Sequence, residues 1–290
     1  MYKNVSRNEL CWCNSGIKYK YCHLKIDEKL KSLELKGNKI PCKELILNDK
    51  QIEGVRESGR LNTHLLDYIS DYIGPGMTTS DIDDMIYNET IRLGGVPATL
   101  NYNNYPKSIC TSVNNQVCHG IPSKDTVLVE GDIVNIDLST NLNGYFSDSA
   151  RVFTIGKVSD ERLRLIDISK KCIDIGLSFI TPWQSMKFIG EKISRFAEDE
   201  GYKIAVDIGG HGIGLKFHEE PFVSYAEHGT DLLLVPGMIF TIEPAVNVGG
   251  SDVYEDFDNN WTIYTQDGKD SAQWEVTVLV TEDGYEVLAQ

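Results

Sequence analysis

The stretch NIDLSTNLNGYFSDSA, residues 135–150, decides the fold because it predicts a β-hairpin with one acid in each strand. Apolar and polar residues alternate up to Ser139, and a polar run then leads to Asn143-Gly144, a pair typical of two-residue hairpin turns. The acids are Asp137 and Asp148. Burying a carboxylate is costly unless a partner charge or a metal compensates for the lost hydration. If both side chains are buried, a partner charge or a metal must therefore compensate for them.

The turn leaves two registers open. A loop at residues 142–143 would put Asp137 opposite Asp148, whereas a loop at residues 143–144 would put Asp137 opposite Ala150 and leave Asp148 as its diagonal neighbour. Either register brings the carboxylates within roughly 5–8 Å of each other. No lysine or arginine lies beside them on that face, so a divalent cation would remove the repulsion. Two solvent-facing aspartates at a strand edge are the alternative.

Three further residues fit a metal site. Glu243 ends the apolar run MIFTIEP, and Glu275 interrupts the apolar run SAQWEVTVLV. His211 lies in GGHGIG, where the glycines allow a backbone or a substrate to come close. Oxygen-rich sites with one imidazole suit Mn²⁺, Fe²⁺ or Co²⁺ better than structural zinc. Because four carboxylates exceed what one divalent ion needs, the pattern predicts two ions.

The charge of the chain is uneven. Residues 1–40 contain nine Lys/Arg and four Asp/Glu, a balance of +5, and the other 250 residues contain 19 and 39, a balance of −20. The acidic body is not expected to bind nucleic acid over a wide surface, whereas the basic head could. No apolar run approaches the ~18 residues of a membrane span, and the N-terminus lacks the apolar region of an export signal. We expect a cytoplasmic protein with no membrane partner.

Periodicity and turn signals divide the chain. KGNKIPCKEL predicts a linker, so we place a domain boundary near residue 40, with domains 1–40 and 41–290. GDIVNID (131–137) and GMIFTIE (237–243) share one pattern, and an HGI precedes each, which suggests a duplicated half-domain. Helices are predicted over 26–35, 48–73, 80–93, 159–178 and 185–200, and strands over 107–118, 131–139, 144–155, 203–209, 237–247, 260–266 and 272–290.

With these motifs in view, residues 45–290 resemble a type I methionine aminopeptidase of peptidase family M24. The resemblance lies in YPKSICTSVNNQVCHGIP, GDIVNIDL, GYFSDSARVF, GGHGIG, FHEEP, FTIEP and SAQWE. It implies an α+β pita-bread fold, in which two pseudo-symmetric αβ halves enclose a dinuclear metal site. It also implies a monomer that removes the initiator methionine from nascent polypeptides with a small second residue.

The resemblance assigns roles residue by residue. The five metal ligands of the family match Asp137, Asp148, His211, Glu243 and Glu275. A metal ion activates water and polarises the scissile carbonyl, and Glu243 would handle the proton of that water. The two non-ligand histidines of the family match His119 and His218, which would hydrogen-bond the substrate amide and the developing oxyanion.

The resemblance also assigns a soft, apolar pocket for the methionine side chain. Thr99 stands where many relatives carry a cysteine, and Val276 stands where they commonly carry a histidine. Val276 should point away from Glu275 along a strand, so we expect it to tune activity. The pocket positions are Thr99, Tyr102, Tyr105, Cys110, His119, Phe217, His218 and Trp261.

The head contains a second candidate metal site. CWCNSGIKYKYCH has the spacing C-x-C-x₈-C-H over Cys11, Cys13, Cys22 and His23, a closed ligand set for structural Zn²⁺. It resembles the SEC-C motif, a small zinc knuckle. Lysines and tyrosines interleave around it, a composition that suits rRNA or an acidic protein surface. We therefore expect residues 1–40 to dock on the ribosome or a partner protein.

Two other functions fit parts of the pattern. A proline-directed aminopeptidase or dipeptidase shares the expected fold, but generally carries a longer N-terminal domain than these 40 residues. A non-enzymatic binding protein could keep the fold and lose its metals, but all five ligand positions and both histidines are present here. A metallo-aminopeptidase specific for N-terminal methionine is the prediction.

Overall fold

The predicted hairpin consists of β4 (Ile133–Leu142) and β5 (Tyr145–Thr154) in the computed structural model, which describes residues 5–227 and 229–290. Its turn residues Asn143 and Gly144 have φ angles of 55° and 86°, as a type I′ turn requires. This turn selects the second register, with Asp137 opposite Ala150 and Asp148 opposite Ser139. The two acids are therefore diagonal neighbours on one face.

The long helices begin where the sequence supplies caps. Asn48 and Gln51 form a capping box at the start of α2, and Thr78 and Asp81 form one at α3. The Ser159 side chain accepts a hydrogen bond at the start of α4. The helices are α1 (Leu24–Glu34), α2 (Asp49–Ser70), α3 (Thr79–Arg92), α4 (Asp160–Ser178) and α5 (Lys187–Asp199).

The strands form sheets that match the repeated pattern GDIVNID and GMIFTIE of the sequence. β4 pairs with β1, β2 and β5, whereas β9 lies at the centre of a sheet with the order β15-β14-β9-β7-β8. GDIVNID and GMIFTIE thus lead into corresponding central strands. The other strands are β1 (Val96–Pro97), β2 (Cys110–Val113), β3 (Gln116–Cys118), β6 (Lys203–Ile204), β7 (Gly210–Gly212), β8 (Glu219–Val223), β9 (Ile239–Ile242), β10 (Ala245–Asn247), β11 (Val253–Glu255), β12 (Ile263–Thr265), β13 (Ser271–Gln273), β14 (Val276–Val280) and β15 (Tyr285–Ala289).

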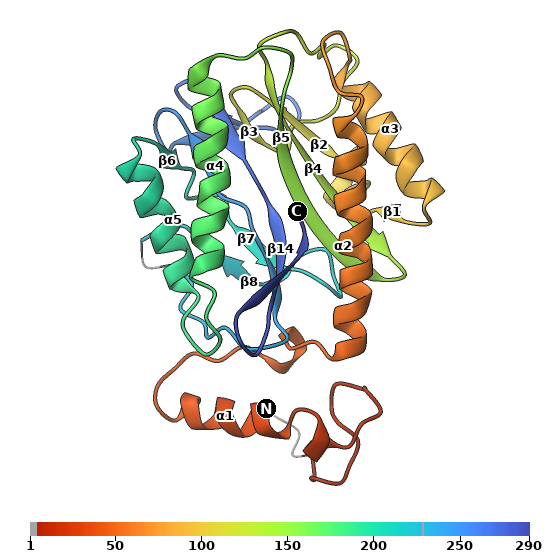
Figure 1. The fold of residues 1–290 in the computed structure, drawn as a ribbon, viewed down its shortest axis with the longest axis vertical. Coiled ribbons are helices and arrows are strands. Elements are labelled where there is room, and N and C mark those ends of the chain that lie inside the picture. The colour runs from red at the N-terminus through yellow and green to blue at the C-terminus, as the bar shows by residue number, and fades with distance from the viewer. Residues whose placement is uncertain (1–4, 228) are drawn as a thin grey trace.

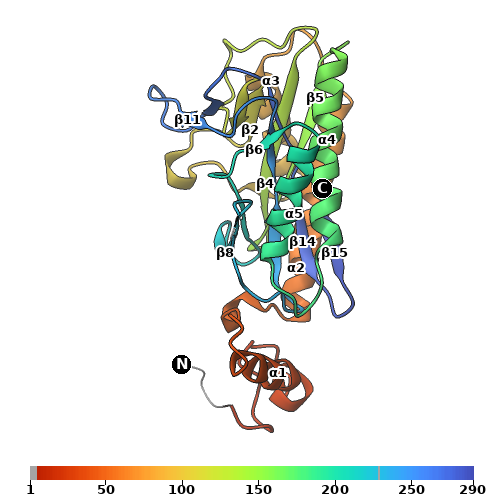
Figure 2. The same cartoon turned by 90° about the vertical axis from the view of Figure 1, so that its left-hand side faces the viewer.

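Each half has its own apolar core. α2 and α3 lie beside each other over one half, and α4 and α5 lie over the other (Figure 1). Val134, Ile136 and Leu138 of β4 pack in one cluster with apolar residues of α2 and α3. Because side chains alternate along a strand, Asp137 points to the opposite face. In the side view α2, α4 and α5 form a layer on one side of the strands (Figure 2).

The two halves join between β5 and β14. Ala150 and Glu275 form a bridge, in which the Glu275 amide donates to the Ala150 carbonyl at 3.0 Å and the Ala150 amide donates back at 3.3 Å. The Thr277 hydroxyl donates to the Asp148 carbonyl at 2.7 Å and accepts from the Asp148 amide at 3.1 Å. These contacts hold an acid of each half at the junction.

Several strands of the structure are shorter than those predicted from the sequence. The predicted strand over 107–118 is two short strands, β2 and β3, and the predicted strand over 203–209 is β6, of two residues. Turn residues such as Asn114, with a φ of 55°, interrupt the pairing. In the part of the chain that the structure describes, no helix combines the length and the apolar composition needed to cross a membrane.

The N-terminal unit lies at one end of the body (Figure 1). Leu30 of α1 is 2% exposed and packs into the core of the half that contains α4 and α5. The Lys43 ammonium lies 2.7 Å from the Asp27 carboxylate, which also accepts hydrogen bonds from the Trp12 indole and the Tyr19 hydroxyl. The unit is therefore fixed against the body.

Candidate metal centre

Four acids and a histidine from both halves meet at the β5–β14 junction. One ligand atom each of Asp148, His211 and Glu275 lies within 4.8 Å of the others. Asp137 and Asp148 lie close enough for each carboxyl group to shift the pKa of the other, and the same holds for Glu243 and Glu275. The structure therefore brings all five predicted ligand positions together, although they are up to 138 residues apart in the chain.

His211 presents one ring nitrogen to this cluster. Its Nε2 lies 3.8 Å from Asp148 Oδ2 and 3.7 Å from Glu243 Oε1. Its Nδ1 lies 3.0 Å from the Gly212 carbonyl, to which it donates as the protonated nitrogen. This hydrogen bond fixes the tautomer and leaves the Nε2 lone pair for a cation.

The glycines beside His211 are needed for close packing of the backbone. A Cβ at Gly210 or Gly212 would collide with the main-chain carbonyl of Thr241 or of Glu220. The spacing GGHGIG therefore lets β7 approach its neighbours and sets the position of the imidazole between them.

The donor set fits divalent metal ions. Burial raises the pKa of all four carboxyl groups, and neighbouring carboxylates raise the pKa of Asp148, Glu243 and Glu275 further. Asp148 Oδ1 and Glu275 Oε1 are buried without a hydrogen-bond partner among the described residues. Divalent cations would supply both the missing partner and the missing positive charge.

Sequence reasoning missed the residues that orient Glu243. Its carboxylate accepts from the Thr241 hydroxyl at 2.7 Å and from the Gln273 amide at 3.3 Å, and the Gln273 amide also donates to the Glu243 carbonyl at 3.0 Å. The Asn135 amide in turn donates to the Gln273 side chain at 3.1 Å. Each of these residues lies two positions before a site acid, and residues two apart in a strand share a face. That spacing was the available signal.

His119 occupies a backbone conformation that is uncommon for a residue with a side chain. Its φ is 56°, in the left-handed region. The loop is held on both sides, because the Gly120 amide donates to Ser112 Oγ at 3.1 Å and the Gly120 carbonyl accepts from the Tyr105 hydroxyl at 3.0 Å. Burial lowers the pKa of His119, so its ring is neutral near pH 7.

His218 lies against the candidate ligands. Its ring centroid is 4.0 Å from that of His211, and it stacks on Tyr102 at 5.0 Å. Burial, together with the neighbouring imidazoles of His211 and His119, lowers the pKa of His218 to about 3. Because the His119 and His218 rings stay neutral, they can donate hydrogen bonds without repelling a nearby cation.

The predicted pocket residues form two aromatic groups beside these histidines. Tyr102 and Phe217, with centroids 4.7 Å apart, lie beside His211 and His218. Trp261 lies 5.0 Å from Tyr105 and 5.9 Å from His119. Cys110 is 4% exposed and lies opposite Asp137 in the pairing of β2 with β4. Thr99 is 8% exposed, and its hydroxyl donates to the Ser139 hydroxyl at 3.4 Å.

Val276 faces away from the acids, as the alternation of the strand predicts. It is 4% exposed and belongs to the apolar core beneath α4 and α5. Its backbone pairs with Ile242 of β9. Its side chain therefore packs in the core, and its link to the acids is the β14 backbone that follows Glu275.

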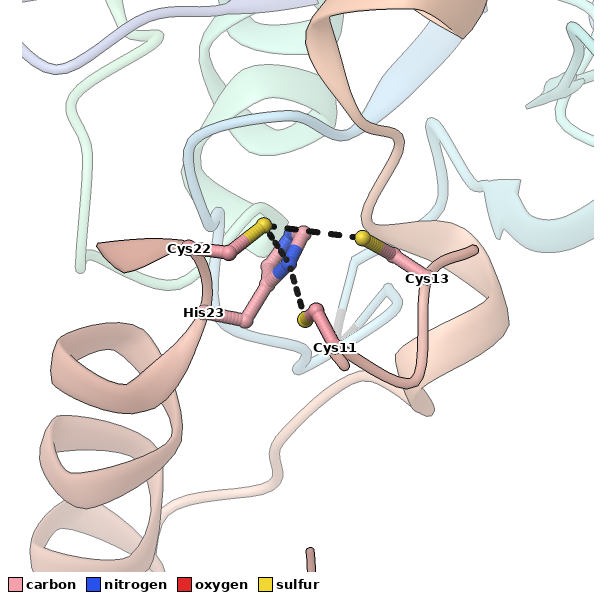
Figure 3. A group of neighbouring side chains, drawn as sticks. All are labelled: Cys11, Cys13, Cys22 and His23. Atoms are coloured by element: carbon pink, nitrogen blue, oxygen red, sulfur yellow. Dashed lines mark hydrogen bonds between the residues drawn. The ribbon is translucent and has the colours of Figure 1, made fainter. Parts of the chain in front are cut away.

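The predicted zinc ligands of the head converge as well (Figure 3). His23 Nδ1 lies 3.3 Å from the Cys11 sulfur and 3.1 Å from the Cys22 sulfur, and the Cys13 and Cys22 sulfurs are 3.5 Å apart. Ligand atoms about 2.0–2.3 Å from a tetrahedral zinc ion lie roughly 3.3–3.8 Å from one another. The group therefore has the composition and nearly the dimensions of a structural zinc site.

Comparison with known proteins gives both regions a family. Residues 53–282 match metallopeptidase family M24, and residues 7–25 match the SEC-C motif. The methionine aminopeptidase of Chlamydia trachomatis serovar D is 38% identical, over 98% of both chains. Methionine aminopeptidase A of Synechocystis sp. is 40% identical over 84% of this chain and 96% of its own.

A solved structure agrees with the architecture. The crystal structure of methionine aminopeptidase from Rickettsia prowazekii is 39% identical and superposes with a TM-score of 0.82. The match covers 84% of this chain and 99% of that chain. Together with the two halves described above, it confirms the predicted pita-bread fold.

Proposed function

The chain belongs to the methionine aminopeptidases of metallopeptidase family M24, and we propose that it removes the initiator methionine from nascent polypeptides whose second residue is small. The observation that carries this proposal is the junction at which Asp137, Asp148, His211, Glu243 and Glu275 meet. The small-residue preference rests on the family resemblance.

The same five residues would hold two divalent ions, with Mn²⁺, Fe²⁺ or Co²⁺ as the proposed metals. When bound, such ions lower the pKa of a water molecule and polarise the scissile carbonyl. Glu243, held by Thr241 and Gln273, would take the proton of the attacking water and deliver it to the leaving amine.

The two neutral histidines would hold the substrate. We propose that His119 and His218 hydrogen-bond the scissile amide and stabilise the oxyanion that develops on its carbonyl oxygen. Each ring packs against another ring of the site, His119 against Trp261 and His218 against His211, which supports a defined orientation. The methionine side chain would pack between the two aromatic groups, in a wall that includes Thr99, Tyr102, Tyr105, Cys110, Phe217 and Trp261.

We further propose that residues 1–40 are a zinc knuckle and linker and that residues 41–290 are the catalytic domain. The knuckle would bind one Zn²⁺ through Cys11, Cys13, Cys22 and His23 and dock on the ribosome. Exposed Lys18, Lys25 and Lys31 support this role. We also propose that the enzyme works in the cytoplasm, where nascent chains emerge, and that it is a monomer.

Peptide cleavage tests the catalytic proposal. The enzyme should release methionine from Met-Ala-Ser and leave Met-Lys-Ser and Ala-Pro-Ser intact. Cleavage of Ala-Pro-Ser alone would favour a proline-directed peptidase. Docking is tested by co-sedimentation with ribosomes: the full chain should pellet with them, and a variant with Lys18, Lys25 and Lys31 changed to Glu should not.

A further inference from the structure

Five buried polar side chains join α2 to the face of the β4–β5 hairpin that lies opposite its two acids. Ser58 and Asn62 are four residues apart on α2, so they lie on one side of the helix. On the hairpin they meet Thr140, Ser147 and Ser149. All five residues are at most 1% exposed. Because burying a polar group is costly unless it is hydrogen-bonded, such a cluster is tolerated only when it is well paired.

Hydrogen bonds within the cluster pair its members. The hydroxyl oxygens of Ser58, Thr140 and Ser147 form a triangle with sides of 3.0, 2.9 and 3.0 Å. Thr140 and Ser147 are directly opposite each other in the pairing of β4 with β5, so Ser58 contacts both strands at one position. Among the described residues, none of the five has a buried side-chain atom without a partner. A fully paired network holds packed elements in one arrangement.

Asn62 contacts both strands directly beside the two acids. Its side-chain amide donates to the Leu138 carbonyl at 2.6 Å and to the Ser147 carbonyl at 3.3 Å. Its side-chain carbonyl accepts from the Ser149 hydroxyl. Leu138 directly follows one acid in β4, and Ser147 and Ser149 flank the other acid in β5. One side chain therefore joins the two segments that carry the acids.

These contacts hold Asp148 from the side opposite the centre. Because side chains alternate along a strand, Ser147 and Ser149 point toward α2 while Asp148 points toward the centre. The Thr277 hydroxyl fixes the Asp148 backbone from β14. Like charges on Asp137 and Asp148 favour their moving apart until a cation binds. The hydrogen bonds to α2 and β14 oppose that movement.

We propose that Asn62 is a positioning residue that fixes the separation of Asp137 and Asp148 and so preorganises them for divalent ions. Asn62 lies on the other face of the hairpin, so it acts on the centre only through the two strands. The inference rests on the proposed function, because it assigns a role at the metal centre of the peptidase.

The test is Mn²⁺ binding to the full-length, zinc-loaded protein after a chelator has emptied the centre. Free Mn²⁺ is counted by electron paramagnetic resonance, so the affinity is measured without turnover. Mn²⁺ prefers oxygen ligands to thiolates, so the knuckle does not compete for it. Asn62→Leu keeps a side chain of similar size and removes its three hydrogen bonds, and it should weaken Mn²⁺ binding by about tenfold. At saturating Mn²⁺, methionine release from Met-Ala-Ser should return close to the parent rate, because the ligands themselves are unchanged.

Two further variants separate positioning from general stability. Ser149→Ala removes one of the three hydrogen bonds of Asn62 and should weaken Mn²⁺ binding less than Asn62→Leu does. Thr79→Val is the matched control, because it removes two hydrogen bonds that join buried Thr79 of α3 to the Ser123 backbone, at 3.1 and 2.9 Å. Thr79→Val should leave the Mn²⁺ affinity unchanged. Thermal melting reports the stability of each variant.

Three results would count against the inference, and they differ in what else they refute. Equal Mn²⁺ affinity of Asn62→Leu and the parent would overturn it and leave the metal centre in place. An equal loss of affinity in Thr79→Val would reduce the effect to destabilisation and also overturn it. A parent protein that neither binds Mn²⁺ nor releases methionine would refute the proposed function as well. If Asn62→Leu does not fold, Ser149→Ala decides, and an unchanged affinity in that variant overturns the inference.

Discussion

Asn48 joins the proposed zinc knuckle to the body of the protein, and replacing it should reveal how strongly the two stabilise each other. Its Oδ1 accepts from the Gln51 amide at 3.1 Å and caps α2, whereas its Nδ2 donates to the Cys13 carbonyl at 2.8 Å. The residue is 8% exposed, so both hydrogen bonds are shielded from water. Asn48→Asp keeps the cap and loses the donor, and Asn48→Ala loses both.

The expected costs follow from these contacts. Leaving the Cys13 carbonyl without its donor costs about 1–3 kcal/mol, so Asn48→Asp should lower the free energy of unfolding of the zinc-loaded protein by that amount. Asn48→Ala should cost about 1 kcal/mol more, because the helix cap is also lost. Urea denaturation measures both values.

Zinc removal separates the two contributions. A knuckle of this size folds on its metal, so after chelation the Cys13 contact is already broken and Asn48→Asp should match the parent. Thr78→Ala removes the cap of α3, far from the knuckle, and should cost about 1 kcal/mol with or without zinc. The reasoning is refuted if Asn48→Asp equals the parent when zinc is bound, or if its cost persists unchanged after chelation.

Four other substitutions probe the site and the fold. Gln273→Ala or Thr241→Val should lower metal affinity or kcat by about 10–100-fold, checked by metal titration and peptide cleavage; unchanged values would remove these residues from the orientation of Glu243. Asp83→Ala should raise KM for methionine peptides, because Asp83 accepts from the Ser108 amide at 2.9 Å and anchors the loop that carries Tyr105 and Cys110; an unchanged KM would contradict this. Glu89→Gln should lower the free energy of unfolding by less than about 1 kcal/mol at pH 7. Hydrogen bonds from Arg92 and His64 lower the pKa of Glu89 from 4.5 to about 2, so this cost should shrink as the pH falls from 4.5 to 2. A cost that does not change with pH in urea denaturation would refute this reasoning.

Much of the fold was predictable because its signals are local. Alternation and the Asn143-Gly144 pair predicted the hairpin, and the apolar repeat from Asn48 predicted α2. The hairpin register stayed open, because loops at residues 142–143 and at 143–144 are both compatible with the sequence. The φ angles of Asn143 and Gly144 resolve it, and a backbone angle cannot be read from composition.

The sequence predicted which residues to consider as ligands, and the structure brings them close together, but the residues that support them were not predicted. Acids in apolar strands draw attention because burial makes them costly. Thr241 and Gln273 are ordinary strand residues until the fold places them against Glu243. Likewise, CWCNSGIKYKYCH predicted a zinc ligand set, but the contact of Asn48 with Cys13 depends on how two distant segments pack.

The central claim is that the centre at the β5–β14 junction drives methionine release. The most direct measurement is the rate of methionine release from Met-Ala-Ser by EDTA-treated enzyme, before and after adding Mn²⁺ or Co²⁺, alongside His211→Ala. We expect no release without metal, recovery on adding it to the parent protein, and no recovery in His211→Ala at the same metal concentration. Release that survives EDTA, or full recovery in His211→Ala, would contradict the assignment of this centre.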